Sequence, residues 1–409
     1  MTTMAIDNKE KEVLNVPHLR FPEFSGEWYS YPLTDFMSFK NGMNPDAKRF
    51  GHGTKFISVM DILNNQFIRY DNIRASVEVI AGDIETYGVN YGDILFQRSS
   101  ETLEDVGQAN VYLDSKPAVF GGFVIRGKSK GNYHPMFFRY LLASPTARKR
   151  IIVKGAGAQH FNIGQDGLSK VYLDIPSIQE QEKIAKLLEC IDDRIATQNK
   201  IIDKLQSLIK GLIDDIITPQ CEQCVAFETL YSKAGEGGTP TTSNVEFYEN
   251  GNIPFVKIDD LGDKYLLANK DYITELGLKK SSAWLIPVNS IIYSNGATIG
   301  AISINKYPIC TKQGILGIVP NSNIDVEYLY YFMRSSYFQK EVERVVTEGT
   351  MRTAYLKDIN HIKCPIPDLD KQKEISHTLS ALSFKEDIES QLLQKYQIQK
   401  QYLLSQMFI

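Results

Sequence analysis

The sequence predicts an α+β protein in which two α/β globular units alternate with two long helices that form an antiparallel coiled coil. Three observations predict this fold class. Short apolar runs rich in β-forming residues recur in each half, two long segments carry apolar residues at coiled-coil spacing, and both halves present these features in the same order. The chain is therefore predicted to be an internal duplication with pseudo-twofold character.

The duplication is clearest where each long helix begins. Residues 174–184 read DIPSIQEQEKI, and residues 365–375 read PIPDLDKQKEI. Both contain Ile-Pro followed by Gln and Ile at fixed offsets, and a proline just ahead of a helix is typical of a helix start. Three further pairs of segments match in the same order: 56–62 with 255–261, 93–96 with 290–293, and 140–144 with 331–335.

The helices differ in how regularly their apolar seam repeats. In the first helix, positions 184, 188, 191, 195, 198, 202, 205, 209, 212 and 216 alternate steps of four and three, and all but Gln198 are Ile or Leu. Such steps keep one seam facing a partner helix. In the second helix Glu386, Glu389 and Lys400 interrupt the corresponding seam. A helix from Gln179 to Ile217 would be about 58 Å long.

These features divide the chain into five expected segments. They are an N-terminal tail packing on the first unit (1–30), the first globular unit (31–173), the first spacer helix (174–218), the second globular unit (219–364) and the second spacer helix (365–409).

Composition favours a cytoplasmic protein. The N-terminus has no apolar signal region, and no stretch approaches the ~18 continuous apolar residues of a membrane span. The five cysteines show no disulfide framework, and the lone C-x-x-C at Cys221 and Cys224 lacks a second ligand pair for zinc. We expect reduced thiols and no metal.

The net charge of −4 hides an uneven distribution of charge. Residues 115–165 contain no Asp or Glu, whereas the long helix that follows is rich in acids. This acid-free run is a candidate phosphate-binding surface, although a solvated basic face would look the same. Its nine fixed positive charges are Lys116, Arg126, Lys128, Lys130, Arg139, Arg148, Lys149, Arg150 and Lys154. The corresponding stretch 306–356 carries six Lys or Arg against five acids.

The sequence contains no catalytic motif in the structural context that its chemistry needs. Residues 122–129 fit the phosphate-loop pattern G-x-x-x-x-G-K-[ST], but the variable positions Phe-Val-Ile-Arg predict a strand, and Gly131 and Pro135 oppose the helix that such a loop needs. A nucleophile elbow, a dinucleotide fingerprint and an amino-methyltransferase motif are also missing. The sequence therefore predicts a binding protein rather than an enzyme.

Polar and basic residues gather in turn-rich segments of both globular units. Arg, Gln and Asn can read base edges, whereas Ser, Thr and Lys suit phosphates, so these segments are candidates for contacting DNA. The candidates in the first unit are Lys40, Asn41, Asn44, Lys48, Arg49, Gln97, Arg98, Ser99, Ser100, Lys154, Gln159, His160 and Asn162. Those in the second unit are Gly238, Thr239, Thr241, Lys257, Tyr293, Ser294, Asn295, Thr350 and Arg352.

With these residues in place, the sequence resembles the specificity subunits of type I restriction–modification systems over nearly its whole length. The resemblance is carried by residues 16–28, by Gly-Gly-Thr-Pro at 237–240, by Gly157-x-Gln159, and above all by the duplicated Ile-Pro-x-x-x-x-Gln helix start. The first unit departs from the second in having Asn41-Gly42-Met43-Asn44-Pro45 where the second has Gly-Gly-Thr-Pro.

The resemblance implies that each globular unit is a target-recognition domain that reads one half of a bipartite site in double-stranded DNA. It implies that the helices set the separation of the halves and recruit two modification (methyltransferase) subunits and two restriction (ATP-dependent translocase and nuclease) subunits. It implies no catalysis and no cofactor for this chain, because S-adenosylmethionine, ATP and Mg belong to the partners. The alternative is a pseudo-symmetric coiled-coil scaffold that joins protein partners without DNA recognition.

Overall fold

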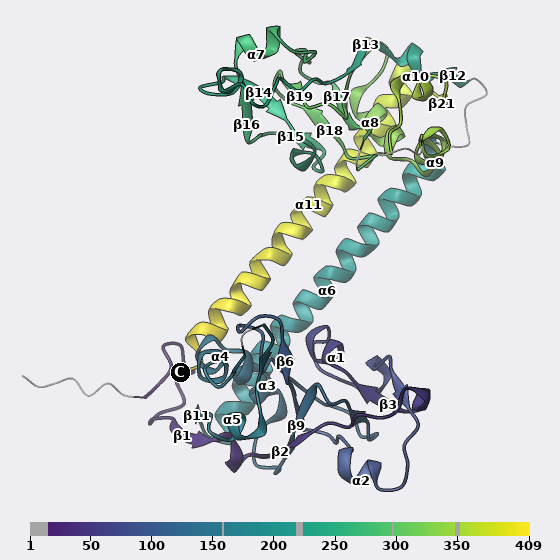
Figure 1. The fold of residues 1–409 in the computed structure, drawn as a ribbon. Coiled ribbons are helices and arrows are strands. Elements are labelled where there is room, and N and C mark those ends of the chain that lie inside the picture. Colours follow the sequence, from purple (N-terminus) through teal and green to yellow (C-terminus); the bar gives the residue numbers. More distant parts are fainter. Residues whose placement is uncertain (1–14, 158, 218–223, 297, 348–351) are drawn as a thin grey trace, which may run out of the picture. The chain divides into compact units, whose positions relative to one another are not determined.

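The computed structural model describes residues 15–157, 159–217, 224–296, 298–347 and 352–409 (Figure 1). It contains two compact units. Unit 1 comprises Met1–Asn199 with Leu392–Ile409, and unit 2 comprises Lys200–Gln391. The long helices α6 (Ile178–Ile217) and α11 (Leu369–Gln406) are therefore each shared between the two units.

Unit 1 is built on a four-stranded sheet of order β2-β9-β5-β7 and a three-stranded sheet of order β4-β3-β8. The first sheet comprises β2 (Met37–Asn41), β9 (Val124–Ser129), β5 (Ile94–Gln97) and β7 (Ala109–Val111), and the second β4 (Ser76–Val77), β3 (Phe50–Ile57) and β8 (Val119–Phe120). Two small pairs are β1 (Tyr29–Pro32) with β11 (Tyr172–Ile175), and β6 (Ser99–Ser100) with β10 (Phe161–Asn162). Its short helices are α1 (Val59–Leu63), α2 (Asp83–Tyr87), α3 (Pro135–Ala143), α4 (Pro145–Ile152) and α5 (Gln165–Ser169).

Unit 2 repeats this plan with a five-stranded sheet of order β13-β20-β17-β18-β15 and a three-stranded sheet of order β16-β14-β19. Its strands are β12 (Cys224–Ala226), β13 (Tyr231–Glu236), β14 (Ile253–Val256), β15 (Tyr265–Leu266), β16 (Asp271–Ile273), β17 (Ile291–Ser294), β18 (Ile302–Asn305), β19 (Cys310–Thr311), β20 (Ile315–Pro320) and β21 (Lys363–Pro365). Its short helices are α7 (Glu275–Lys279), α8 (Val326–Arg334), α9 (Ser336–Val345) and α10 (Leu356–Ile359).

The strand registers confirm the duplication residue by residue. Gln97 of β5 pairs with Val124 of β9 in unit 1, and Ser294 of β17 pairs with Ile315 of β20 in unit 2. The parallel pair Phe56 with Val119 likewise corresponds to Phe255 with Cys310. The two units therefore have the same pairing around the same central strands, although few of the side chains are alike.

The glutamine shared by both helix starts hydrogen-bonds two backbone groups that are distant from each other in sequence. The Gln181 amide oxygen accepts from the His134 backbone N–H at 3.0 Å, and its amide nitrogen donates to the Pro176 carbonyl at 3.1 Å. Gln372 makes the same two bonds in unit 2, with Asp325 at 2.8 Å and Pro367 at 2.8 Å. Both amides are buried, so the repeated glutamine ties the start of each long helix to the helix that follows the sheet.

The long helices pack antiparallel along the predicted seam. Ile184, Leu188 and Ile191 of α6 are buried in the core of unit 1 together with Leu403 and Met407 of α11. The predicted seam fails toward the end of α6, where Ile213 is buried and Leu212 is only partly so. This shift follows from the helix packing on the globular core of unit 2, which does not require a strict heptad.

Two of the polar residues that interrupt the seam of α11, Lys400 and Glu386, have partners on α6. Lys400 forms an ion pair with Asp192 in unit 1, and Glu386 accepts from Gln206 in unit 2. As residue numbers rise along α6 they fall along α11, which is the antiparallel order. These interruptions are therefore contacts between the helices rather than breaks in the coiled coil.

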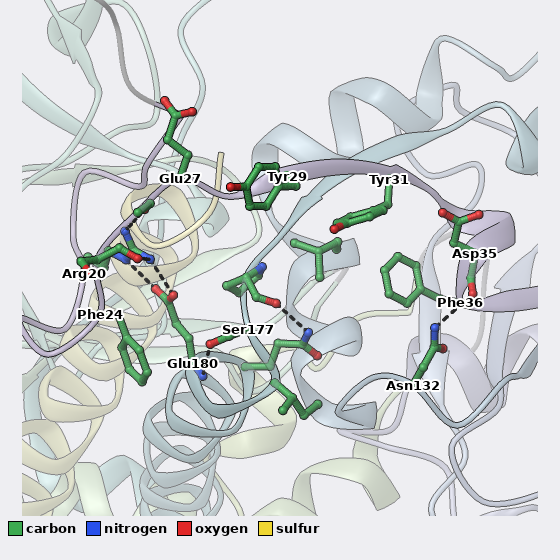
Figure 2. Close-up of a pocket in the computed structure, with 16 residues that line it drawn as sticks. Arg20, Phe24, Glu27, Tyr29, Tyr31, Asp35, Phe36, Asn132, Ser177 and Glu180 are labelled. Carbon is green, nitrogen blue, oxygen red and sulfur yellow. Dashed lines mark hydrogen bonds and ion pairs between the residues drawn. The ribbon is translucent and has the colours of Figure 1, made fainter.

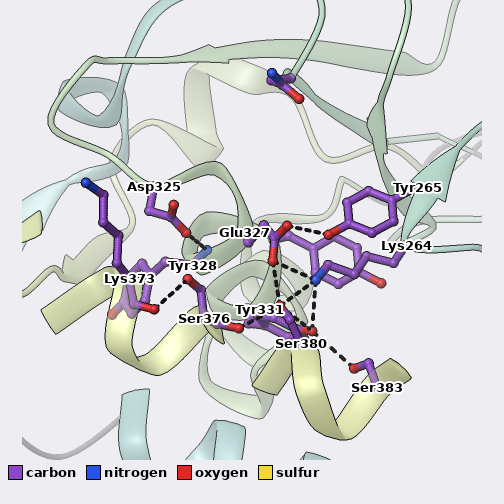
Figure 3. Close-up of polar contacts among 12 residues, drawn as sticks. Lys264, Tyr265, Asp325, Glu327, Tyr328, Tyr331, Lys373, Ser376, Ser380 and Ser383 are labelled. Carbon is purple, nitrogen blue, oxygen red and sulfur yellow. Dashed lines mark hydrogen bonds and ion pairs between the residues drawn. The ribbon is translucent and has the colours of Figure 1, made fainter. Parts of the chain in front are cut away.

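A polar network fixes the sheet of unit 2 to its helices (Figure 3). The Lys264 ammonium donates to Glu327 at 2.8 Å and to Ser380 of α11 at 2.7 Å. Burial alone would lower the pKa of Lys264, but its bond to Glu327 and its contact with Tyr331 raise that pKa above its ordinary value. Burial likewise opposes ionisation of Glu327, yet hydrogen bonds from Lys264, Ser380 and Tyr265 hold its pKa below the usual range.

Unit 1 makes the corresponding connection with fewer groups. The Tyr140 hydroxyl donates to Asp192 at 2.8 Å, and Lys400 lies over the Tyr140 ring at 5.8 Å. Tyr140 and Tyr331 occupy the same place in the repeat. Each unit therefore sets a lysine against this tyrosine, but the lysine comes from α11 in unit 1 and from the globular part of unit 2.

The caps of α3 and α8 predict that the two units respond differently to acid. The His134 ring nitrogen accepts from the Phe137 N–H at 3.3 Å, whereas Asp325 caps α8 at 2.8 Å. Burial lowers the pKa of His134, partly offset by Glu182. The cap's stabilisation is therefore complete above the unfolded histidine pKa of about 6.5 and is lost as the pH falls below it.

Replacing His134 by asparagine, which caps without titrating, should reduce this loss of stability by about 1 kcal/mol between pH 7.5 and pH 5.5. The loss of stability is measured by urea unfolding at the two pH values, and hydrogen exchange of the α3 amides reports on this helix in particular. His377→Asn, at an exposed site on α11, is the control and should leave the pH dependence of α3 unchanged. An unchanged pH dependence in His134→Asn would contradict the assignment.

Candidate nucleic-acid interface

The end of β5 is the centre of a group of loops in unit 1. The Arg98 N–H donates to the Phe123 carbonyl at 2.9 Å, and the Arg98 carbonyl accepts from Ile163 at 2.9 Å. On the other side the Gly42 N–H donates to the Val124 carbonyl at 3.1 Å. These bonds join the segments around residues 41–44, 97–100, 121–123, 156–157 and 159–162, which we call the first loop cluster.

The same bonds occur at the end of β17 in unit 2. The Asn295 N–H donates to the Gly314 carbonyl at 3.1 Å, and the Asn295 carbonyl accepts from Ala354 at 2.8 Å. Gly237 donates to Ile315 at 2.9 Å, as Gly42 does to Val124. The described residues 236–241, 294–296, 311–314 and 352–354 form the second loop cluster.

Glycines allow the backbones within each cluster to approach closely. A Cβ built on Gly42 would lie 2.0 Å from the Gly121 carbonyl oxygen, and one on Gly237 would lie 2.1 Å from the Thr311 carbonyl oxygen. A Cβ on Gly238 would lie 2.3 Å from the Ala283 nitrogen. Any side chain would therefore force the loops apart, which explains the glycine at the same place in both repeats.

Several predicted residues meet in the first loop cluster. Asn44 is exposed and its side-chain oxygen fills the place where a Cβ on Gly122 would stand. Arg98 is half-buried and donates from Nη1 to the Gly122 carbonyl at 3.2 Å. Ser99 and Ser100 pair with β10, and the Ser99 hydroxyl bonds Asn162. Asn41 ends β2, while Gln159 and His160 are exposed in the loop closed by the Ala156 and Asn162 pair.

Other predicted residues of unit 1 have their contacts elsewhere. Lys40 lies over the Tyr87 ring at 5.4 Å, and Arg49 is held by the Glu78 carbonyl and by an ion pair with Asp83. Lys48 and Lys154 are exposed. These four residues are not joined to the cluster by any hydrogen bond or ion pair found in the described residues.

In unit 2 the predicted residues are also divided. Thr239 accepts from the Gln313 N–H at 3.3 Å, and Thr241 is exposed. Lys257 forms an ion pair with Asp271 at 2.8 Å, and Arg352 forms one with Glu343. Thr350 lies outside the described residues.

Burial corrects four of the predicted contacts. Tyr293, Ser294 and Asn295 are at most 1% exposed, and Gln97 is 6% exposed. The Ser294 hydroxyl bonds the Gly296 carbonyl and the Asn295 amide donates to Ala354, so both support the loop cluster from beneath. Their side chains do not reach a surface that DNA could touch.

The cations of the acid-free run differ in how they are held. Six of the nine cations in this run have a partner within unit 1. In most cases that partner is a backbone carbonyl. These six are Lys116, Arg126, Lys130, Arg139, Arg148 and Arg150. Lys128, Lys149 and Lys154 remain exposed. The cations of this run thus bond carbonyl oxygens more often than carboxylates.

A pocket of about 640 Å³ lies elsewhere in unit 1 (Figure 2). Arg20 forms a two-pronged ion pair with Glu180 on its wall, with both N–O distances 2.8 Å, and Trp28 donates to the same carboxylate at 3.3 Å. Asp35 and Phe36 place the pocket at the end of β2 remote from Asn41. The segment around residues 16–28 thus anchors the start of α6 rather than contributing to the loop cluster.

The described residues offer no metal-binding group of three or more His, Cys, Asp or Glu side chains. Cys190, Cys224, Cys310 and Cys364 are free, and Cys221 lies outside the described residues. Across those same residues, no helix is long and apolar enough to cross a membrane.

Comparison with known proteins gives a family for this architecture. The type I restriction modification DNA specificity domain matches residues 25–207 and again residues 232–396. A putative type I restriction enzyme MjaX specificity subunit of Methanocaldococcus jannaschii is 25% identical over 92% of this chain and 91% of its own length. The MjaVIII specificity subunit of the same organism is 23% identical over 96% and 93%.

Solved structures show the same fold. The type I restriction–modification S subunit from M. genitalium superposes with a TM-score of 0.58 at 17% identity, covering 96% of this chain and 99% of that one. A chain from a study of complex assembly and conformational transition of the type I R-M system gives 0.59 at 14% identity, covering 92% and 96%. The chain belongs to the family of type I restriction–modification specificity subunits. Its two matched segments are DNA specificity domains, and the predicted fold class is confirmed.

Proposed function

We propose that this chain reads a bipartite site in double-stranded DNA, with the first loop cluster on one half-site and the second on the other. The observation that carries this is the repeated backbone of the two clusters with different side chains at equivalent places. Arg98 corresponds to Asn295, Phe123 to Gly314, and Asn44 to Thr239. A common scaffold with exchanged side chains is what two readers of different sequences require.

The proposal includes protein partners that methylate and cleave the DNA, using S-adenosylmethionine, ATP and Mg bound outside this chain. Exposed apolar side chains on α11 support a partner surface on the helices: Phe384 is 66% exposed in unit 2, and Ile398 is 61% exposed in unit 1. Two modification subunits and two restriction subunits are the proposed complement, one of each for each half of the duplication.

DNA binding by the assembled complex tests the proposal. Adenine methylation is mapped in host genomes with and without this gene, which gives the two half-sites. The chain is then purified with its modification subunits and titrated with a duplex carrying both half-sites. We expect specific binding whose affinity falls steeply with salt, as phosphate contacts require. A complex that binds no duplex at low salt would favour a scaffold that joins protein partners alone.

A further inference from the structure

An exposed phenylalanine lies in the segment that imitates a phosphate loop. Phe123 is 69% exposed, and within the part of the chain that the structure describes its ring has no aromatic or cation partner. Val124–Ser129 is strand β9, so the G-x-x-x-x-G-K-[ST] match is not a nucleotide loop. A single exposed apolar side chain is ordinary on its own. What distinguishes Phe123 is that Arg98 holds its backbone at the end of β5.

Arg98, a predicted DNA contact, holds the backbone of Phe123 and of the residue before it. Its carbonyl accepts from the Arg98 N–H at 2.9 Å, and the preceding carbonyl of Gly122 accepts from the Arg98 guanidinium at 3.2 Å. The Asn44 side chain fills the space beside Gly122, since a Cβ there would lie 2.0 Å from its oxygen. Phe123 is thus exposed in the same short segment that contacts Arg98 and Asn44, two residues able to read base edges.

The position equivalent to Phe123 in the second loop cluster carries no side chain. The corresponding residue is Gly314, whose φ of +89° disfavours a side chain. Its carbonyl accepts from Asn295 just as that of Phe123 accepts from Arg98. At this one position the repeat therefore keeps the backbone bond, with an aromatic ring in unit 1 and no side chain in unit 2.

Given the proposed function of unit 1, we infer that Phe123 contacts a thymine methyl group in the first half-site, beside the base that Arg98 reads. The thymine C5-methyl is the apolar feature of the major-groove edge, and arginine reads guanine in that same groove. Phe123 is then a specificity-determining residue that selects an A·T pair in one half-site only.

Exchange of thymine for uracil tests this, because it removes the methyl group alone. The first half-site is identified as the one at which an Arg98→Ala variant binds more weakly. Each thymine of that half-site is replaced by uracil, one at a time. The affinity of each duplex for the purified complex of this chain with its modification subunits is then measured. For the wild-type chain, one replacement should weaken binding about fourfold. Phe123→Ala should bind the thymine duplex several-fold more weakly and show no further loss with uracil. Phe123→Leu should keep part of the uracil effect.

Tyr91→Ala is the matched control, because Tyr91 is 63% exposed in the same unit and lies at the opposite end of β5. It should keep both the affinity and the uracil effect. Equal uracil effects in wild type and Phe123→Ala would overturn the inference, as would a first half-site without an A·T pair. So would loss of the modification subunits from Phe123→Ala, which would make Phe123 a protein contact. Failure of the wild-type complex to bind any duplex would instead overturn the proposed function.

Discussion

Replacing Arg98 by alanine is expected to weaken binding at one half-site by roughly 1–3 kcal/mol and to relax the choice of one base there. One guanidinium nitrogen of Arg98 donates to the Gly122 carbonyl at 3.2 Å, and the Arg98 backbone is hydrogen-bonded to Phe123 and Ile163. A guanidinium held in this way can donate two further bonds to guanine, the commonest specific contact in the major groove. Competition binding with duplexes altered at each position of either half-site measures the effect.

Two controls separate base reading from general charge. Arg69→Ala removes an exposed cation of the same unit. Arg69 follows Ile68, whose N–H donates to Val111, and Val111 pairs with Ile94 at the end of β5 remote from Arg98. It should leave selectivity intact. Arg352→Ala, in the second loop cluster, should affect the other half-site. If Arg98→Ala weakened both half-sites equally, the two clusters would not act as separate readers.

Shortening both long helices together is expected to move the two half-sites closer without changing either. Removing residues 196–202 from α6 and 390–396 from α11 deletes one heptad from each, so the antiparallel seam stays in register around the Asp192–Lys400 and Gln206–Glu386 contacts. Seven residues correspond to about 10 Å of helix, or about three base pairs of DNA. Because three base pairs also rotate the duplex, overall affinity should fall.

The preferred spacer is measured by selecting from duplexes in which only the separation of the half-sites varies. Deleting the seven residues from α6 alone is the contrasting variant. It should destabilise the protein, because the seam loses its register. Restoring a heptad of the original α6 and α11 residues should bring back the original spacer. An unchanged spacer in the doubly shortened chain would exclude the helices as the element that sets it.

The division into five segments ending at residues 30, 173, 218 and 364 stays a prediction. In the structure α6 and α11 are each shared between the two compact units. Residues 15–28 contribute Trp28 to the core of unit 1, which agrees with a tail that packs on that unit without fixing its boundary.

The fold class is confirmed, whereas the DNA-contacting residues stay a prediction. At Gly42 and Gly237 the glycines of the predicted loops do mark close backbone approaches. The sequence overestimated the polar residues at the ends of β5 and β17, because a strand end does not reveal whether its last side chains face the core. It did not single out Phe123, although matching the starts of β9 and β20 sets Phe123 against Gly314.

The sequence by itself determined the duplication, the two long helices and the positions of their apolar seams. These properties are encoded locally, in the repeat of apolar residues and in the Ile-Pro that precedes each helix. Only the tertiary structure decided which polar groups serve the fold. Gln181 and Gln372 clamp helices, and Arg126 is buried against a backbone carbonyl, because strand pairing between distant segments places those partners beside them. Burial makes each such partner obligatory, so the residues left exposed around Arg98 and Thr241 are the ones that we propose contact DNA.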